Sequence, residues 1–342
     1  MSTEKTLLRI SNLSVTFALP DKTTAYAVQD VSFRIAPGER VALVGESGSG
    51  KSVTAHSIMR IEYPGVIAKG SSITLRDQEM TLPTLREKDL RPFRGGVAAM
   101  VFQDPTTAFQ PVVKVGAQIV EAILAHRPMQ KTTARREALA LLRSVSIEDA
   151  EDAFEKYPFQ FSGGQLQRAL IAMALAGEPD LLIADEATTA LDVSVQAEIL
   201  DLINKIVRER DMALLFISHN LGVVAGLCDR VLVMYAGHIV EEGSVRDIFA
   251  SPRHPYTQAL LQAVSRIDKP KHRNFSTIPG HPPRVDEVIV GCPFRLRACP
   301  YAEAICETEL PVLAPIGGAG QLAACHLVEK TGKHNTEETH VC

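Results

Sequence analysis

The chain has 342 residues, of which 46% are hydrophobic and 22% are charged, and it contains no Trp. This length suits one large α/β domain with a smaller appendage. The net charge of −4 gives no overall attraction to a polyanion, so we expect no nucleic-acid partner. The apolar stretches are too short or too interrupted by charge for a membrane span, and the first residues lack a signal-peptide core. We therefore expect a cytosolic protein, in which any membrane role requires a spanning partner.

The N-terminal part predicts strands that lead into a glycine-rich loop. Apolar and polar residues alternate over residues 7–17 and 26–35, as they do in half-buried strands. Val41–Gly45 predicts a short buried strand before the loop, and Ser52–Arg60 has helical composition after it. The order strand, loop, helix is typical of a phosphate-binding turn.

The middle of the chain alternates between helical and strand-like segments. Val97–Phe102 predicts a short strand, and the pattern is helical from residue 104 to about residue 157. Gln165–Ala176 predicts a further helix. Leu181–Ala184 and Ala213–Ile217 are fully apolar, as strands are in a parallel sheet that is covered on both faces.

The character of the sequence changes after residue 264. Before this point, Val231–Tyr235 and His238–Glu241 predict a hairpin. Beyond it, prolines interrupt a stretch with little periodicity, which contains four cysteines and ends in a polar tail. We therefore expect one domain over residues 1–264, with a helical subdomain at about 104–165, and an extension over 265–342.

One eight-residue segment matches G-x-x-x-x-G-K-[ST], the phosphate loop. Its glycines let successive backbone N–H groups point at a phosphate, with a helix N-terminus behind them. The lysine neutralises β- and γ-phosphate oxygens, and the final serine is a ligand for Mg²⁺. The segment consists of Gly45, Glu46, Ser47, Gly48, Ser49, Gly50, Lys51 and Ser52.

Polar residues follow three of the predicted strands. Asp185 and Glu186 end an apolar strand, where Asp185 would hold Mg²⁺ and Glu186 would act as the general base toward water. Gln103 follows another strand and can contact Mg²⁺ or the attacking water. His219 follows the strand next in sequence to Asp185 and can hydrogen-bond a γ-phosphate. Each of these residues alone would suggest only a structural role.

A second candidate anion site occurs at Ser162, Gly163, Gly164 and Gln165, which open a helix. Ser162 is a good N-cap, and the glycine pair leaves backbone N–H groups uncovered. Because Gly45–Ser52 already serves one triphosphate, we expect this segment to serve the nucleotide of a second subunit.

These motifs together resemble the nucleotide-binding subunits of ABC transporters, most closely the dipeptide, oligopeptide and nickel branch of bacterial importers. The resemblance covers residues 7 to about 328 and includes branch-specific segments such as His254–Thr257 and Ile278–Gly280. It implies an ABC cassette of the P-loop NTPase class, with a RecA-like parallel core, an antiparallel β subdomain and an α-helical subdomain, followed by a Cys-rich extension. It also implies ATP and Mg²⁺ as cofactors.

The resemblance assigns further roles. Phe17 would stack on adenine, with Tyr26 as the alternative residue for this contact. Ser162–Gln165 would be the signature that contacts the γ-phosphate of the partner, and Asp192 would lie at the dimer interface. The implied partners are a second, homologous ATPase subunit, two permease subunits and an extracytoplasmic solute-binding protein. The chain itself would sit peripherally on the cytoplasmic face of the membrane.

Four of the six cysteines form a group, at Cys292, Cys299, Cys306 and Cys325. Four thiolates can hold zinc or a [4Fe–4S] cluster, and the spacing fits neither zinc ribbons nor ferredoxins. Residue chemistry alone favours zinc, whereas the importer branch implies an iron–sulfur cluster on this quartet. A soluble ABC ATPase that acts on ribosomes or DNA stays open as a second function, and a metal-sensing regulatory ATPase as a third.

Overall fold

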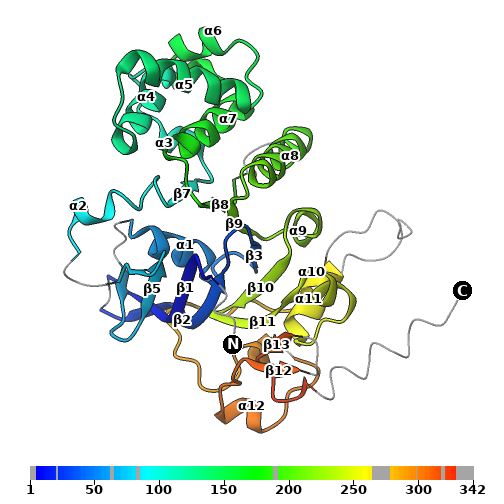
Figure 1. The fold of residues 1–342 in the computed structure, drawn as a ribbon. Helices are drawn as coiled ribbons and strands as arrows, with labels where there is room; N and C mark the ends of the chain where they lie inside the picture. The colour runs from blue at the N-terminus through cyan, green and yellow to red at the C-terminus, as the bar shows by residue number, and fades with distance from the viewer. Residues whose placement is uncertain are drawn as a thin grey trace, which may run out of the picture.

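The computed structural model describes residues 5–20, 22–61, 65–81, 85–187, 192–263, 278–297, 299–316 and 320–328. An antiparallel sheet of the order β2-β1-β5-β6, in which β4 also pairs with β1, forms one side of the molecule (Figure 1). The predicted strands β1 and β2 are confirmed, whereas β4, β5 and β6 are too short to produce a recognisable alternation. The bounds are Leu8–Ala18 (β1), Thr24–Ile35 (β2), Gly65–Ile67 (β4), Ser72–Leu75 (β5) and Gln78–Glu79 (β6).

A second sheet forms the core and contains the predicted buried strands. Five of its strands are parallel neighbours in the order β10-β3-β9-β8-β7. They are β3 (Arg40–Val44), β7 (Ala98–Val101), β8 (Leu181–Asp185), β9 (Ala213–Ser218) and β10 (Arg230–Tyr235). Nearly all of their residues are buried, which confirms the expected parallel sheet covered on both faces.

Successive residues of the core strands belong to two separate hydrophobic cores. In β3, Val41 and Leu43 pack in a core shared with β1, β2 and α1 (Lys51–Met59). Ala42 and Val44 pack in the other core, which includes residues of α8 and α9. This division follows from the two-residue period of a strand. The helices of this part are α8 (Val193–Glu209), α9 (Leu221–Leu227), α10 (Val245–Ala250) and α11 (Pro255–Ala263), with the short α2 (Glu87–Leu90) at the edge.

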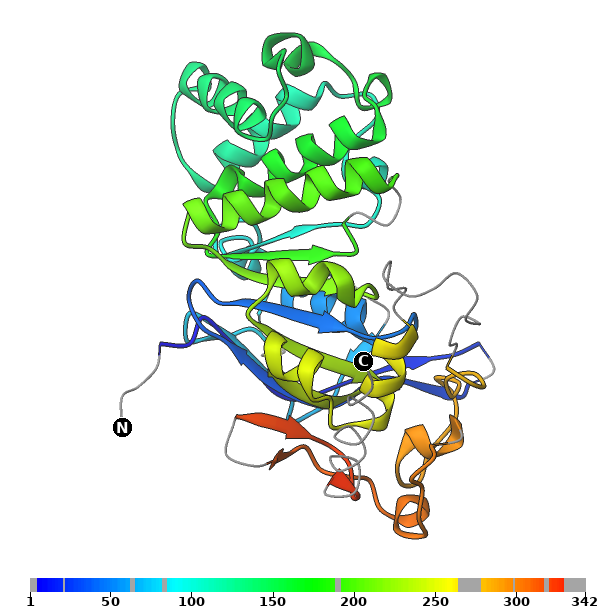
Figure 2. The same cartoon turned by 90° about the vertical axis from the view of Figure 1, so that its right-hand side faces the viewer.

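A helical part occupies one end of the molecule, as both ribbon views show (Figures 1 and 2). It confirms the helical pattern predicted from residue 104 to residue 157. Gly116 of α4 lies against the ring of Phe154 in α6 so closely that a Cβ atom would come within 2.2 Å of it. The helices are α3 (Pro105–Ala108), α4 (Val115–His126), α5 (Lys131–Ser144), α6 (Ala150–Glu155) and α7 (Gly163–Ala174), with short turns η1 (Pro158–Gln160) and η2 (Leu175–Gly177).

The C-terminal segment, by which we mean the described residues between 278 and 328, lies at the opposite end of the molecule and joins the core sheet. β11 (His238–Ser244) pairs with β10 and with β13 (Gln321–Ala323), and β13 pairs with β12 (Ala314–Ile316). The turn η3 (Pro293–Arg297) and α12 (Ile305–Thr308) complete the segment. The expected boundary at residues 264 and 265 lies outside the described residues, so the division into 1–264 and 265–342 stays a prediction.

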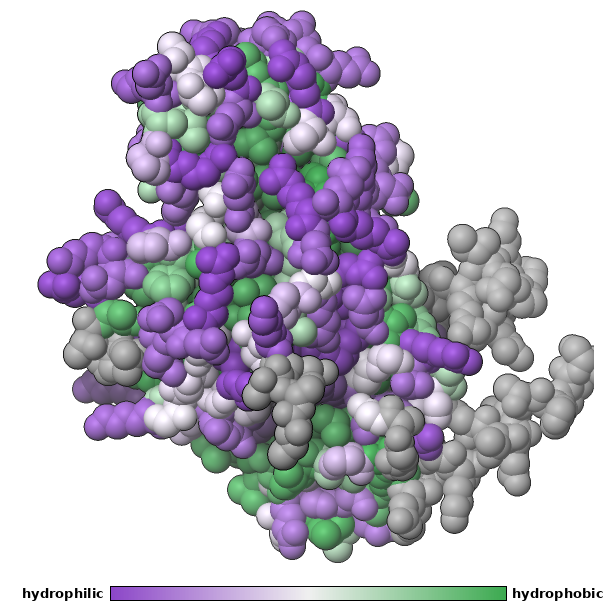
Figure 3. Space-filling model, in the orientation of Figure 1, coloured by the Kyte–Doolittle hydropathy of each residue, from purple (hydrophilic) through white to green (hydrophobic). Residues whose placement is uncertain are grey.

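The surface differs between the two ends of the molecule. Figure 3 shows hydrophobic residues at the lower end of the molecule, where Figure 1 places the C-terminal segment. Val288, Val290 and Val312 of this segment are 73%, 61% and 80% exposed. No helix in the described ranges combines the length and the apolar character that crossing a bilayer requires.

A buried carboxylate fastens the C-terminal segment to the sheet. Glu241 of β11 is fully buried and accepts hydrogen bonds from the backbone N–H groups of Arg253 (2.6 Å) and His254 (2.9 Å) and from Gln321 Nε2 (2.8 Å). Burial raises the pKa of Glu241. Its hydrogen-bond partners come from β13 and from the approach to α11, so this one side chain joins three elements.

Replacing Glu241 by Ala would leave these buried donors without an acceptor. We expect the E241A variant to lose about 2 to 4 kcal/mol of free energy of unfolding, measured by equilibrium urea denaturation. E121A, on the exposed face of α4, is the control and should change this free energy by less than about 0.5 kcal/mol. Equal losses in both variants would show that Glu241 has no such role.

Candidate functional site

A cavity of 780 Å³ lies at the carboxyl edge of the core sheet, between the glycine-rich loop and the N-terminal sheet. It brings together predicted site residues from four separate segments of the chain. Phe17 lines it, in keeping with the expected contact to adenine, whereas the alternative residue Tyr26 is not among the lining residues. The cavity is lined by Phe17, Ala18, Leu19, Ala25, Ala27, Ser47, Gly48, Gly50, Lys51, Ser52, Val53, Gln103, Glu186 and Val285.

The loop requires glycine at specific positions. Gly48 and Gly50 have φ values of +79° and +107°, in the left-handed region that side chains rarely adopt. At Gly50 a Cβ atom would also lie 2.4 Å from the carbonyl oxygen of Ala27. No side chain caps α1, which begins at Lys51, and Lys51, Ser52 and Val53 line the cavity. The N–H groups of this first turn are therefore available as donors for phosphate.

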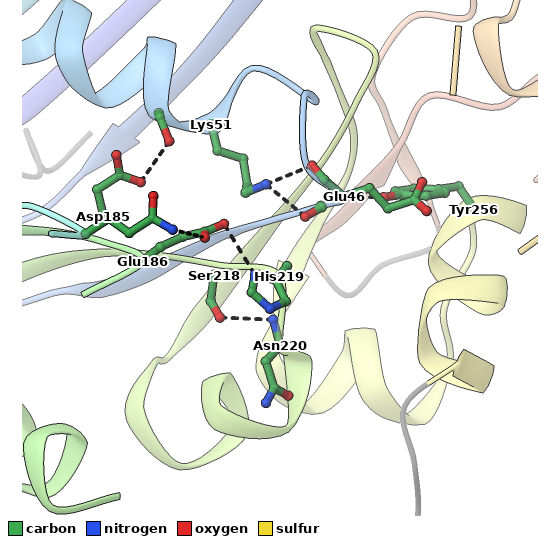
Figure 4. A network of polar contacts seen from close by, with 11 residues as sticks. Glu46, Lys51, Asp185, Glu186, Ser218, His219, Asn220 and Tyr256 are labelled. Carbon is green, nitrogen blue, oxygen red and sulfur yellow. Dashed lines mark hydrogen bonds and ion pairs between the residues drawn. The ribbon is translucent and has the colours of Figure 1, made fainter. Parts of the chain in front are cut away.

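Lys51, the first residue of α1, is buried. Its Nζ donates to the carbonyl oxygens of Gly45 (2.9 Å) and Glu46 (2.8 Å), as Figure 4 shows. Burial lowers the pKa of Lys51, and the nearby carboxylates of Glu186 and Asp185 oppose this effect. Because phosphate oxygens would favour the charged ammonium further, the position suits a phosphate ligand.

Ser52 and Asp185 form the candidate Mg²⁺ site. Ser52 Oγ donates to Asp185 Oδ1 (3.0 Å), and Asp185 is only 6% exposed. Burial raises the pKa of Asp185, which a bound cation would reverse. A hydroxyl and a carboxylate side by side are the hard oxygen ligands that Mg²⁺ prefers, so these residues fit the ion. His56, which the sequence did not single out, lies 3.8 Å from Asp185 Oδ2, and burial lowers its pKa.

Glu186 lies between two of the other predicted catalytic residues. Gln103 Nε2 donates to Glu186 Oε2 (3.3 Å), and His219 Nδ1 lies 3.3 Å from Glu186 Oε1. Its backbone N–H donates to the Ile217 carbonyl (3.1 Å), and its φ of +45° is uncommon for a residue with a side chain. These contacts bring Gln103, Glu186 and His219 together, and Figure 4 shows Glu186 beside His219.

The Ser162–Gln165 segment lies outside this cavity. Ser162 Oγ accepts from the Gln165 N–H (3.3 Å), and the Gln165 side chain accepts from the Ser162 N–H (3.1 Å). A Cβ atom on Gly164 would lie 2.6 Å from Val195 of α8, so close packing already accounts for this glycine. Gly163 is exposed. Ser162 and Gly164 thus have structural roles within the chain, and the N–H group of the exposed Gly163 is what a second nucleotide could contact.

Asp192 caps α8. Its Oδ1 accepts from the Val195 N–H (3.0 Å) and from Ser194 Oγ (2.7 Å). The backbone hydrogen bond from Val195 contributes most to lowering the pKa of this carboxyl group. Asp192 is exposed, and its place at a dimer interface stays a prediction.

The four grouped cysteines do not form a recognisable metal site. Cys292 and Cys306 are adjacent, since the Cys292 N–H donates to the Cys306 carbonyl (2.9 Å). Burial raises the pKa of Cys292, Cys299 and Cys325, and the neighbouring thiols add to this effect. In the described residues, which include all four, no three His, Cys, Asp or Glu side chains are arranged to hold a metal ion. The expectation of an iron–sulfur cluster, or of zinc, is therefore not supported: the thiols gather without converging on one centre.

Two family models match the sequence. The first, described as ABC transporter, covers residues 28–189, and the second, described as oligopeptide/dipeptide transporter, C-terminal region, covers residues 240–306. The first model spans the glycine-rich loop, the Ser162–Gln165 segment and the Asp185-Glu186 pair. The second spans part of the C-terminal segment, including Cys292, Cys299 and Cys306.

Similar proteins cover nearly the whole chain. The oligopeptide transport ATP-binding protein OppD of Salmonella typhimurium is 45% identical over 323 residues, which is 93% of each chain. The dipeptide transport ATP-binding protein DppD of Bacillus subtilis is 46% identical over 305 residues, 89% of this chain and 90% of its own. Among solved structures, a dimeric ATP-binding cassette in a post-hydrolysis state, bound to ADP and Pi, superimposes with a TM-score of 0.61 at 26% identity. It covers 70% of this chain and 99% of its own.

The position of Glu186 predicts how a Glu186→Gln variant binds and hydrolyses a nucleoside triphosphate. Glu186→Gln keeps the shape of the side chain but removes the carboxylate that we predict to accept a proton from water. We expect hydrolysis of a bound triphosphate to fall by about 10² to 10⁴-fold, while binding of the triphosphate is nearly unchanged. Phosphate release and fluorescent-nucleotide binding measure the two quantities. Glu209→Gln, on the exposed end of α8, is the control, and wild-type turnover in E186Q would disprove the assignment.

Proposed function

Because the chain belongs to the family of ATP-binding subunits of oligopeptide and dipeptide ABC transporters, we propose that it drives uptake of peptides or related small solutes by binding and hydrolysing ATP. The observation that carries this proposal is the contact of Glu186 with Gln103 and His219 at the cavity that the phosphate loop borders. Lys51, Ser52, Gln103 and Glu186 line this cavity, and His219 and Asp185 contact it through Glu186 and Ser52.

The chemistry follows from the positions of these groups. Lys51 and the N–H groups of the loop hold the β- and γ-phosphates. Ser52, Asp185 and Gln103 would hold Mg²⁺, which when bound neutralises phosphate charge and orients the phosphate for attack. Glu186 accepts a proton from the attacking water, and His219 donates a hydrogen bond to the γ-phosphate as charge develops there.

The site needs a second subunit to close. Ser162–Gln165 contributes nothing to the cavity of its own chain, yet the exposed Gly163 presents its N–H group at the start of α7. We propose that this helix start and Asp192 contact ATP on a homologous ATPase subunit. The similar cassette bound to ADP and Pi is itself dimeric, which supports this arrangement.

The remaining partners follow from the transport function. Two permease subunits would form the path through the membrane, and a solute-binding protein would deliver the solute outside the cell. The chain would then bind the cytoplasmic face of the membrane through the permeases. The alternative, a soluble ATPase that acts on nucleic acid, is disfavoured by the net negative charge and by the relatives, whose names refer to transport.

The metal content of the C-terminal segment can be measured directly. A [4Fe–4S] cluster on Cys292, Cys299, Cys306 and Cys325 stays a prediction that the arrangement of the thiols does not support. Protein purified without oxygen should be brown and contain stoichiometric iron if the cluster exists. Colourless protein without iron would exclude it, and stoichiometric zinc would establish the alternative.

Gly163 offers a test of the paired site. Gly163→Asp places a negative charge in the first turn of α7, which favours the helix but repels a phosphate. In the assembled transporter we expect ATP hydrolysis at the site facing this residue to fall by about 10²-fold. Gly163→Ala adds no charge and should cost far less. An isolated monomer that hydrolyses ATP as fast as the full complex would contradict the paired site.

A further inference from the structure

The C-terminal segment touches the nucleotide site at two places. The N–H of Tyr26 in β2 donates to the carbonyl of Val285 (2.8 Å), and Val285 lines the same cavity as Phe17. Arg297, in the turn η3, forms an ion pair with the carboxylate of Glu46 in the phosphate loop. The two residues of this ion pair are 251 positions apart in the sequence.

Arg297 is held rigidly on its own segment. It is 4% exposed, and its guanidinium donates to the carbonyl oxygens of Ile278 (3.1 Å), Pro279 (3.0 Å) and Gly280 (3.2 Å). Burying a charge is costly unless a counter-charge and hydrogen bonds compensate, and here Glu46 supplies the counter-charge. An ion pair at the surface would constrain the positions of its side chains only weakly. The buried guanidinium of Arg297, in contrast, fixes the position of the Glu46 carboxylate.

Three groups of Glu46 have a partner: the backbone N–H, the backbone carbonyl and the side-chain carboxylate. Its N–H donates to the hydroxyl of Tyr256 (2.9 Å), its carbonyl accepts from Lys51 Nζ (2.8 Å), and its carboxylate pairs with Arg297. Figure 4 shows Tyr256 beside Glu46. The loop residue next to Gly45 is therefore fixed through its main chain and its side chain.

The turn η3 supports both contacts to Glu46. Phe294 of this turn packs on Tyr256 with ring centroids 5.6 Å apart, and on Tyr235 at 5.5 Å. Tyr235 and Tyr256 lie 4.5 Å apart. The turn η3 thus contacts the phosphate loop in two ways. Arg297 pairs with Glu46, and Phe294 packs on Tyr256, whose hydroxyl accepts from the Glu46 N–H.

We propose that Arg297 is a positioning residue for the phosphate loop, so that the C-terminal segment sets the affinity of the site for ATP. A loop already held in one shape loses less conformational entropy when phosphate binds, and this lowers the dissociation constant. Arg297 does not line the cavity, so the chemical step itself should change little. The inference rests on the ATPase function and adds a determinant outside the family's nucleotide motifs.

The test compares ATP binding with turnover in the assembled transporter. In Arg297→Met we expect the dissociation constant and KM for ATP to rise about tenfold, with kcat within about twofold of wild type. Arg297→Lys keeps the charge and should recover part of the affinity. Arg295→Met is the matched control, because Arg295 lies on the same turn but donates to the Val290 carbonyl (3.1 Å).

The loop side gives an independent measurement. Glu46→Gln removes the charge of the other residue in the ion pair. A double variant with Glu46→Gln and Arg297→Met should bind ATP no more weakly than Arg297→Met alone, because both substitutions remove the same interaction. If Arg297→Met does not fold, Glu46→Gln still reports the contact. Unchanged ATP affinity in Glu46→Gln, or a lower melting temperature of Arg297→Met with unchanged affinity, would overturn the proposal. A wild-type protein that fails to bind ATP would instead refute the proposed function.

Discussion

The parallel pairing of β3, β9, β8 and β7 is the constraint that assembles the proposed catalytic groups. Val44 pairs with Ser218, Asp185 with Ile217 and Val101 with Ala184, so the four strands end at one edge of the sheet. The segments that follow them contain the phosphate loop, His219, Glu186 and Gln103. Each strand is buried on both faces, and a shift of one residue would exchange the side chains of the two cores. The packing of the sheet therefore fixes the geometry of the site.

The sequence predicts these groups because their signals are local. A phosphate loop needs its strand, glycines and helix within about twenty residues, and a polar residue after an apolar strand has a defined position in a parallel sheet. Val285 and Arg297 give no such signal. Their partners are far away in sequence, and nothing in a proline-rich stretch indicates which loop it will contact. His56 was missed for a related reason, since a histidine inside a helix has no distinctive pattern.

The helix start at Ser162 shows how a functional motif can also have a structural explanation. From the sequence alone, both glycines indicate a second phosphate site. The structure accounts for Gly164 by its contact with Val195, and for Ser162 by its capping bonds with Gln165. The paired site is supported by a narrower observation: Gly163 is exposed with its N–H at the helix start, and it does not line the cavity of its own chain. The dimeric form of the similar cassette adds a separate line of support.

The contacts of Glu46 connect the nucleotide site to the far end of the core sheet. The Tyr256 hydroxyl reaches the loop, and the N–H of Tyr256 donates to His254 Nδ1 (3.0 Å). Burial lowers the pKa of His254 to about 3, so the ring is neutral and can accept this bond. The His254 N–H donates in turn to Glu241, which also accepts from Gln321 of β13. Arg297 reaches the same loop from η3, so the C-terminal segment is joined to the phosphate loop by two routes that share no hydrogen bond. A segment that was only appended to the domain would have no reason to bury a guanidinium against the loop that binds phosphate.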